Sequence, residues 1–242
     1  MPVSLRDKVV LVLGASSGVG RAVARLFAAE GARVMAAARR EHRLAELKSE
    51  MANTGHAIEI QACDASNAAQ VDALAKVTRE KLGKIDFLIY VTGTNIKNRA
   101  MSALDVPTWD RMIAVNLNGA YYATHAVLPA MREAKNGYLI YVSSISGLMP
   151  DVSGASYQAA KRGLVGFAHA IRVEEKANGI RTCVVCPGLV DTEILECRPV
   201  KPGAEILQHA LQPEDVAEAI LSLARLPERA VVPEIQVLPT YL

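Results

Sequence analysis

Short runs of apolar residues alternate along the chain with longer segments in which apolar residues recur at helical spacing. The apolar runs are predicted to be seven buried strands, at 9–13, 33–38, 57–62, 85–91, 138–142, 180–185 and 235–238. The longer segments are predicted to be helices, at 19–30, 41–53, 67–82, 108–134, 155–177 and 213–225. This alternation predicts an α/β fold in which helices cover both faces of a seven-stranded, mostly parallel sheet.

Composition narrows the class of protein to one ordinary globular domain spanning 1–242. Hydrophobic residues make up 51% of the chain and charged residues 21%, which excludes disordered and fibrous classes. A net charge of +2 provides no basic stripe for nucleic acid, and no apolar run reaches the roughly 18 residues of a membrane span. The run 9–13 is too short for a signal-peptide core, so we expect a cytoplasmic protein without nucleic-acid or membrane partners.

The only long irregular stretch that the pattern leaves is 188–212, which contains Pro199, Pro202 and Gly203. Loops of this length in a compact domain are usually functional or mobile. We interpret it as a substrate loop that covers a site, in preference to a disordered connection.

Two of the four cysteines, Cys183 and Cys186, form a C-x-x-C inside an apolar run. Positions three apart on a strand point to opposite faces, which argues against joint metal binding. We therefore expect reduced core thiols and no metal site.

A glycine-rich turn follows the first apolar run directly and leads into the first predicted helix. Its sequence, Gly-Ala-Ser-Ser-Gly-Val-Gly at 14–20, matches neither the G-x-G-x-x-G fingerprint nor a P-loop. Strand, glycine turn and helix N-terminus nevertheless form a phosphate-binding geometry, although such a turn can also serve helix–sheet packing alone. The cofactor contacts predicted in this turn are Gly14, Ser16, Ser17, Gly18, Val19 and Gly20.

The second predicted strand ends in Arg39 and Arg40, with no acidic residue before Glu41. In dinucleotide folds an acidic residue here binds the ribose 2′-hydroxyl of NAD, whereas an arginine accommodates the 2′-phosphate of NADP. We therefore predict NADP(H) as the preferred cofactor and keep NAD(H) as the alternative. Both arginines could instead be solvated at the edge of a loop.

Tyr157 and Lys161 are four residues apart in a predicted helix, so their side chains share one face. A neighbouring ammonium favours the phenolate form, so we expect Lys161 to lower the pKa of Tyr157 from about 10 towards neutrality. A phenol with such a pKa exchanges protons efficiently with a substrate oxygen. This pair is the leading candidate for the chemical centre.

Taken together, the motifs resemble the classical short-chain dehydrogenase/reductase family over nearly the whole chain. They are, in order, the glycine turn, Asn116, Ser144, Tyr157-x-x-x-Lys161 and Pro187-Gly188. The resemblance implies a single-domain, doubly wound Rossmann fold with the nucleotide at the carboxyl ends of the strands. It also implies a homodimer or homotetramer formed through the long helices that carry Asn116 and Tyr157.

The resemblance assigns a role to each catalytic residue. Tyr157 would protonate a carbonyl oxygen or take a hydroxyl proton, and Lys161 would lower its pKa and bind the nicotinamide ribose. Ser144 would hold and polarise the carbonyl, with Ser143 and Ser146 as neighbouring alternatives. Asn116 would anchor a proton-relay water. Asn118 is the alternative if the register differs. Asn116 could also have a purely structural role, as an asparagine inside a helix that bonds to backbone.

Further positions resemble cofactor contacts of the family. Asp64 would bind the adenine beside Ala65, or would otherwise act as a helix N-cap. Backbone at Gly93 would contact the ribose. The nicotinamide would be held by Pro187, Gly188, Val190 and Thr192.

Three departures from the family pattern concern Leu13, Tyr90-Val91-Thr92-Gly93 and the chain end. Leu13 stands where the family usually has Thr and loses a side-chain hydrogen bond. The usual Asn-Asn-Ala-Gly is replaced at 90–93, which keeps Gly93 but removes the Asn-mediated link between strands and puts local stability in doubt. The ending Gln-Val-Leu-Pro-Thr replaces Val-Asp-Gly-Gly and weakens an assignment to fatty-acid synthesis.

These inferences predict an NADP(H)-dependent oxidoreductase that moves a hydride between the nicotinamide and a ketone or secondary alcohol. One alternative is a 3-oxoacyl-thioester (acyl-carrier) reductase of the same family. Others are a non-catalytic dinucleotide-binding regulator and an isomerase or dehydratase that uses the nucleotide transiently.

The sequence motifs do not identify the substrate. An apolar pocket is expected to include some of Met149, Val152, Leu189, Ile194, Leu195 and His209, each of which could equally be ordinary loop packing. Arg198 and Lys201 could steer an anionic substrate, or could simply be solvated.

Overall fold

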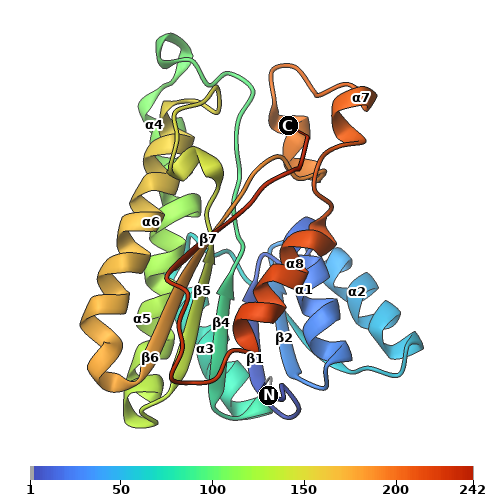
Figure 1. The fold of residues 1–242 in the computed structure, drawn as a ribbon, viewed down its shortest axis with the longest axis vertical. Helices are drawn as coiled ribbons and strands as arrows, with labels where there is room; N and C mark the ends of the chain where they lie inside the picture. The colour runs from blue at the N-terminus through green and yellow to red at the C-terminus, as the bar shows by residue number, and fades with distance from the viewer. Residues whose placement is uncertain (1–2, 242) are drawn as a thin grey trace.

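Seven parallel strands form one sheet at the centre of the computed structural model, which describes residues 3–241 (Figure 1). The strands are β1 (Val9–Leu13), β2 (Arg33–Ala38), β3 (Ile58–Ala62), β4 (Ile85–Tyr90), β5 (Gly137–Val142), β6 (Ile180–Pro187) and β7 (Glu234–Val237). Their order across the sheet is β3-β2-β1-β4-β5-β6-β7, and every pairing is parallel. The sheet is thus wholly parallel where the sequence predicted a mostly parallel one.

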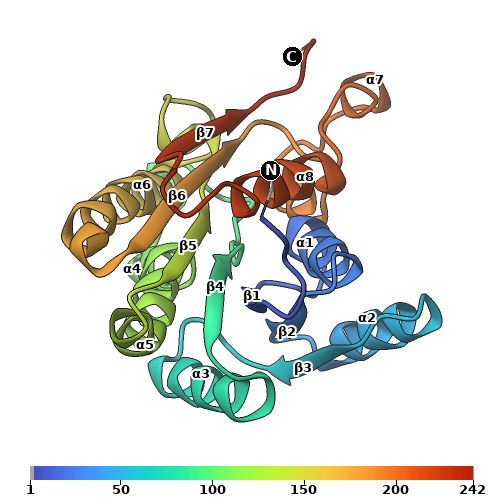
Figure 2. The same cartoon turned by 60° about the horizontal axis from the view of Figure 1, so that its bottom comes forward.

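Helices cover both faces of the sheet, as Figure 2 shows in an oblique view. They are α1 (Gly18–Ala29), α2 (Glu41–Asn53), α3 (Ala68–Leu82), α4 (Val106–Ile113), α5 (Gly119–Glu133), α6 (Ala155–Glu175), α7 (Ala204–Leu207) and α8 (Pro213–Ala224). Core residues of α1, α2 and α8 pack on one face and those of α3, α5 and α6 on the other. This is the doubly wound Rossmann arrangement that the sequence predicted.

Strand residues divide alternately between the two cores because successive side chains point to opposite faces. In β1, Val10 and Val12 join one core while Leu11 and Leu13 join the other. Cys183 and Cys186 of β6 divide in the same way, and both are buried free thiols. The prediction of separate core cysteines is confirmed.

Two predicted segments differ from the structure. The helix predicted at 108–134 is α4 and α5 joined by a π-helical turn, Ala114–Asn118, and π turns inside helices are often found at functional sites. A second long connection, 91–105, contains only the short 3-10 turn Met101–Ala103, so the prediction of a single long irregular stretch was wrong.

The stretch 188–212 is more ordered than a bare loop. It contains a 3-10 helix, Glu193–Cys197, and the short helix α7. A bridge between Val190 and Leu211 closes its base.

Within residues 3–241, no helix combines the length and apolar character that crossing a membrane requires.

Candidate active site

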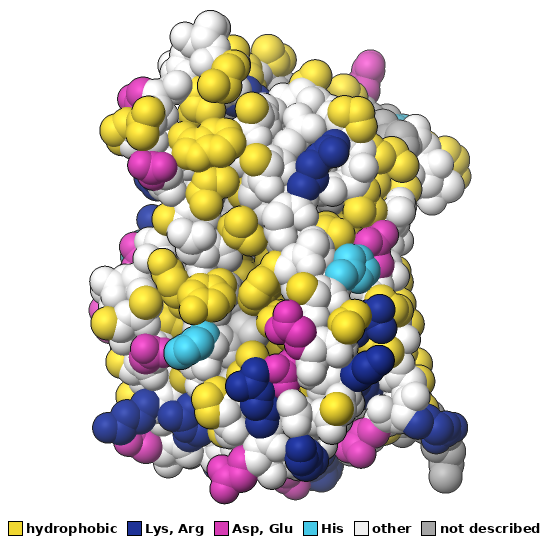
Figure 3. Space-filling model, turned by 90° about the vertical axis from the view of Figure 1, so that its left-hand side faces the viewer, with side chains coloured by type: hydrophobic (Ala, Val, Ile, Leu, Met, Phe, Trp, Pro, Cys, Tyr) yellow, Lys and Arg dark blue, Asp and Glu magenta, His cyan; other side chains and the backbone are white. Residues whose placement is uncertain are grey.

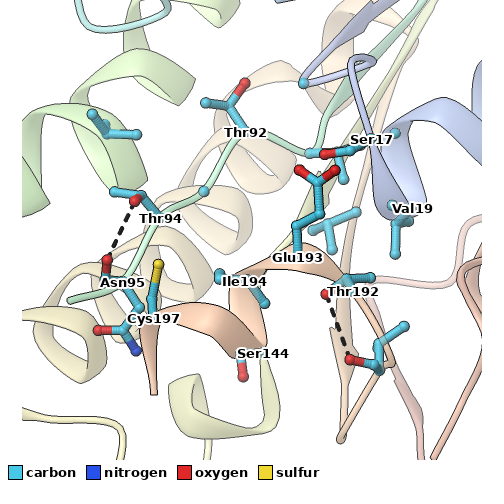
Figure 4. Close-up of a pocket in the computed structure, with 18 of the residues that line it drawn as sticks. Ser17, Val19, Thr92, Thr94, Asn95, Ser144, Thr192, Glu193, Ile194 and Cys197 are labelled. Carbon is cyan, nitrogen blue, oxygen red and sulfur yellow. Dashed lines mark hydrogen bonds between the residues drawn. The ribbon is translucent and has the colours of Figure 1, made fainter. Parts of the chain in front are cut away.

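A cavity of about 470 Å³ opens at the carboxyl ends of the strands, where the order reverses between β1 and β4. Segments from both halves of the sheet and from the loop after β6 line it (Figure 4). All predicted catalytic and cofactor residues line this cavity except Asn116. Residues far apart in sequence therefore converge on one site, as the motifs predicted.

The glycine turn after β1 leaves no room for side chains. Gly14 has φ +101°, and a Cβ added there would lie 2.8 Å from the backbone nitrogen of Thr92. A Cβ at Gly20 would lie 2.2 Å from the carbonyl oxygen of Gly14. The Ser17 side chain makes no capping hydrogen bond to α1, so the first backbone N–H groups of the helix are free to bind an anion. This cradle fits the phosphates of a dinucleotide.

Arg40 connects the glycine turn to the loop after β6. Its Nη2 donates to Ser17 Oγ at 2.7 Å and to Ser16 Oγ at 3.0 Å. Its Nη1 donates to the carboxylate of Glu193 at 2.7 Å, and Arg43 lies 3.7 Å from the same group. Figure 4 shows Glu193 pointing from the loop towards Ser17. Two arginines and two hydroxyls thus form an anion-binding cluster, in which Glu193 supplies the anion.

Arg39 and Asp64 lie on the same side of the cavity. Arg39 is exposed. Burial acts to raise the pKa of Asp64, but hydrogen bonds from Ser66 and, less strongly, the charge of Arg39 lower it below its usual value. Asp64 Oδ1 accepts hydrogen bonds from the backbone N–H and the hydroxyl of Ser66. The N-cap of α3 is Asn67, whose side chain accepts from the Gln70 N–H. The alternative that Asp64 caps this helix was wrong, because the helix begins later.

The three neighbouring serines after β5 have different partners. Ser143 donates to the carbonyl of Lys161 at 2.9 Å and is buried. Ser146 donates to the Asp151 carboxylate. All three line the cavity, but Ser144 is less buried than the other two, and among the described residues its hydroxyl donates only to Ser146, at 3.2 Å. Ser144 is therefore the serine best placed to act on a ligand.

Tyr157 and Lys161 share one face of α6, as predicted, and both are buried at the cavity wall. The Lys161 Nζ lies 5.7 Å from the centre of the Tyr157 ring and donates to the Val142 carbonyl at 3.0 Å. Burial lowers the pKa of Lys161 to about 8. The ammonium is therefore held by backbone at the end of β5.

The protonation of Tyr157 differs from the prediction. Burial raises its pKa to about 12, and the nearby Ser144 hydroxyl opposes that rise. The cations that also oppose it are Arg198 and Arg99, while the Asp151 carboxylate adds to it. The expectation that Lys161 draws this pKa towards neutrality was wrong for this structure, because desolvation of the phenol outweighs the neighbouring charges.

Asn116 lies in the π-helical turn and is fully buried. Its Nδ2 donates to the carbonyls of Met112 and Thr94, and its Oδ1 accepts from the Thr94 N–H at 3.0 Å. A Cβ at Gly93 would come within 3.2 Å of this oxygen and 3.3 Å of Lys161 Nζ. Asn116 thus anchors the connection after β4 beside the lysine. Its side chain bonds to backbone, as the alternative of a purely structural role supposed.

Tyr90, the first residue of the departure at 90–93, makes a link to the π-helical turn and not to another strand. Its side chain is fully buried, and its hydroxyl donates to the carbonyl of Val115 at 2.7 Å. Gly119 leaves the space for it, since a Cβ there would lie 2.3 Å from the Tyr90 hydroxyl. A phenol therefore ties β4 to the π-helical turn where the family pattern has an asparagine.

Three of the six residues expected in an apolar pocket line the cavity. Leu189, Ile194 and Leu195 line the cavity, as does Arg198. Met149, Val152, His209 and Lys201 do not line it, so for these four the alternative of ordinary loop packing or solvation holds. The first two are exposed, His209 packs against the Tyr241 ring, and Lys201 pairs with Glu196.

Sequence reasoning missed three cavity residues that carry charge, namely Arg99, Asp151 and Glu193. They lie in connections without periodic patterns, so no sequence signal marked them. Among residues 3–241, no group of three or more His, Cys, Asp or Glu side chains is placed to hold a metal ion.

Comparison with known proteins extends over the whole site. The short chain dehydrogenase family model matches residues 8–201, which include every residue that lines the cavity. An uncharacterised oxidoreductase of Staphylococcus saprophyticus is 34% identical over 98% of this chain and 99% of its own. A metagenomic short-chain oxidoreductase in complex with NADP has a TM-score of 0.86 at 31% identity, covering 99% of this chain and 100% of that one. A closed serine dehydrogenase complexed with NADP+ has a TM-score of 0.87 at 31% identity, covering 95% and 94%.

Proposed function

The chain belongs to the short-chain dehydrogenase family and is an oxidoreductase, and from this we propose an NADP(H)-dependent enzyme that interconverts a ketone and a secondary alcohol. The observation that carries the proposal is the convergence of Tyr157, Ser144 and Lys161 with the glycine cradle on one cavity. NADP(H), when bound in this cavity, supplies or accepts the hydride.

The side chains then handle the substrate oxygen and its proton. Because burial raises the pKa of Tyr157 to about 12, the phenol is protonated at neutral pH, which is the form required to donate to a carbonyl oxygen. The charges of Arg198 and Arg99 stabilise the phenolate left behind. The Ser144 hydroxyl donates to the same carbonyl oxygen and fixes its position, while Asn116 and Lys161 maintain the wall beside it.

A steady-state assay tests this proposal. The enzyme with NADPH and a panel of aliphatic, aromatic and acidic ketones is expected to consume NADPH and to form the alcohol. The panel also contains a 3-oxoacyl thioester, because the acyl-carrier reductase alternative predicts a clear preference for it. Absence of NADPH consumption with every ketone would contradict the proposal.

The cofactor preference rests on the anion-binding cluster at Arg40. We propose that Arg40 and Arg39 bind the 2′-phosphate, the group that distinguishes NADPH from NADH. Arg40→Ala is expected to raise the Kd for NADPH by about tenfold or more, because charge-assisted hydrogen bonds contribute about 1.5–3 kcal/mol. The Kd for NADH should change little, and Arg39→Ala should act in the same direction. Fluorescence titration with both cofactors measures the effect.

Glu193 provides the opposite test of the same cluster. Its hydrogen bond with Arg40 lowers the pKa of its carboxyl, so it is ionised at neutral pH and competes with a phosphate for Arg40. Glu193→Gln is therefore expected to lower the Kd for NADPH severalfold and to leave that for NADH nearly unchanged. Arg25→Ala, an exposed change on α1 outside the cavity, is the matched control for Arg40→Ala and should alter neither Kd. Equal effects on both cofactors would overturn the 2′-phosphate assignment.

The proposal includes a homodimer or homotetramer that forms through α5 and α6. Apolar side chains gather over the middle and upper parts of this face, with charged side chains below them (Figure 3). Tyr121 on α5 is 50% exposed and packs against Phe167 of α6, and Val173 is 53% exposed. Such a patch is typical of an interface. Light scattering is expected to give two or four times the 25.9 kDa chain mass, and a monomer would contradict it.

A further inference from the structure

Arg99 is a buried cation in the wall of the cavity. It lies in the connection between β4 and α4, and the residue is only 8% exposed. Its Nε donates to the carbonyl of Ile96 at 3.1 Å, and its Nη2 donates to the carbonyl of Cys197 at 2.7 Å. The guanidinium therefore joins the two connections that flank the cavity, one after β4 and one after β6.

No carboxylate within residues 3–241 forms an ion pair with Arg99. Burial of a charged group is costly unless it is paired, so buried arginines normally face an anion. The acidic side chain that shares this part of the cavity, Asp151, instead accepts hydrogen bonds from Ser146 and Ser153. The guanidinium of Arg99 thus contacts only two neutral carbonyls, and the Asp151 carboxylate acts on its charge from beyond ion-pair distance.

The position of Arg99 is set by tight packing against the start of α6. Gly154 has φ +91°, and a Cβ there would lie 2.7 Å from Arg99 Cβ and 2.9 Å from its carbonyl oxygen. Gly154 immediately precedes the helix that carries Tyr157. The cation and the phenol are therefore positioned by the same short segment.

One edge of the guanidinium is left for a ligand. Among the described residues, Nη1 of Arg99 has no hydrogen-bond partner, whereas Nε and Nη2 are both engaged. A second cation, Arg198, lines the same part of the cavity and is half-buried. Within residues 3–241 neither cation forms an ion pair with a carboxylate, which makes this end of the cavity attractive to an anion.

We propose that Arg99, assisted by Arg198, binds the carboxylate of the substrate, so that the enzyme acts on keto acids or the corresponding hydroxy acids. This inference rests on the proposed function. A carboxylate fits the free edge, since the Nη1 group of Arg99 and the second, less buried arginine match its two oxygens. The chain length between carboxylate and carbonyl is then set by the distance from Arg99 to Tyr157.

Matched pairs of keto acids and their methyl esters test the inference. Wild-type kcat/KM with NADPH is measured for 2-oxo, 3-oxo and 4-oxo acids and for the ester of each. For the acid of the correct length we expect kcat/KM to exceed that of its ester on the order of 10- to 100-fold, mainly through a lower KM. The length with the largest acid-to-ester ratio reports the spacing.

Variants separate binding of the carboxylate from a merely structural role. Arg99→Met should lower the ratio to about one, whereas Arg99→Lys should keep part of it because the charge remains. A loss of folding would reduce the rates of acid and ester together and leave their ratio unchanged. Arg198→Met should lower the ratio less, and Arg162→Met, an exposed change on α6, should not lower it.

The outcomes distinguish the proposed carboxylate site from the proposed oxidoreductase activity. NADPH consumption with acid and ester at equal kcat/KM, or an acid preference that survives Arg99→Met, would overturn the carboxylate site and leave the oxidoreductase intact. No NADPH consumption with acids, esters or neutral ketones would overturn both.

Discussion

Replacing Tyr157 with Phe is expected to lower kcat for ketone reduction by about a thousandfold or more, while the Kd for NADPH changes less than about twofold. General acid catalysis by a positioned side chain contributes on the order of 10²- to 10⁴-fold, and this change removes only the proton donor. The ring remains to fill its buried place in α6, so the fold should be unaffected. Single-turnover reduction and fluorescence titration measure the two quantities.

Tyr138→Phe is the matched control for that experiment. Tyr138 is also a buried tyrosine, but its hydroxyl has no hydrogen-bond partner among the described residues, and it does not line the cavity. Its removal should leave turnover unchanged and cost no stability. Equal loss in both variants, or undiminished turnover in Tyr157→Phe, would contradict the assignment of Tyr157 as the acid.

Replacing Lys161 with Met is expected to abolish most turnover and yet to raise the free energy of unfolding by about 2 kcal/mol at pH 7. Burial lowers the pKa of Lys161 from 10.5 to about 8, which corresponds to a penalty of about 3 kcal/mol for holding the charged form in the folded protein. The variant also loses the hydrogen bond to the Val142 carbonyl, which lowers its free energy of unfolding by about 1 kcal/mol and leaves a net gain of about 2 kcal/mol. Urea denaturation at fixed protomer concentration measures the difference.

The pH dependence of that difference has a definite sign. Between about pH 8 and 10.5 the unfolded chain carries a proton on Lys161 that the folded chain has released, so this group makes the wild type more stable as pH rises. Below about pH 8 the folded chain carries the full destabilisation that comes from burying the charged lysine. The stability gained by Lys161→Met should therefore be largest at neutral pH and should shrink towards pH 10. A variant less stable than wild type at pH 7 would contradict the account.

The fold was largely predictable because it depends on patterns that every strand and helix repeats. Apolar runs bounded by turn residues located all seven strands, and the glycine turn located the start of α1 to within one residue. The π-helical turn at 114–118 could not be predicted, because its apolar spacing resembles that of an ordinary helix. Its cause is tertiary: Asn116 bonds the Thr94 backbone and Tyr90 bonds the Val115 carbonyl.

The site was predictable where a motif places a residue on a regular element, and unpredictable where a connection does so. Tyr157 and Lys161 share a helix face by spacing alone. Arg99 and Glu193 reach the cavity only because connections distant in sequence pack together. The raised pKa of Tyr157 has the same origin, since burial is a property of the assembled structure and the sequence showed only the neighbouring lysine.

The central claim is hydride transfer between NADPH and a carbonyl carbon in this cavity, and isotopic transfer tests it most directly. The enzyme is incubated with a ketone and with NADPH deuterated in turn at each of the two positions of nicotinamide C4, and the product is analysed by mass spectrometry. The account predicts an alcohol one mass unit heavier from one of the two labelled cofactors, with one NADPH consumed per alcohol formed. An unlabelled product from both, or a product formed without NADPH consumption, would contradict it.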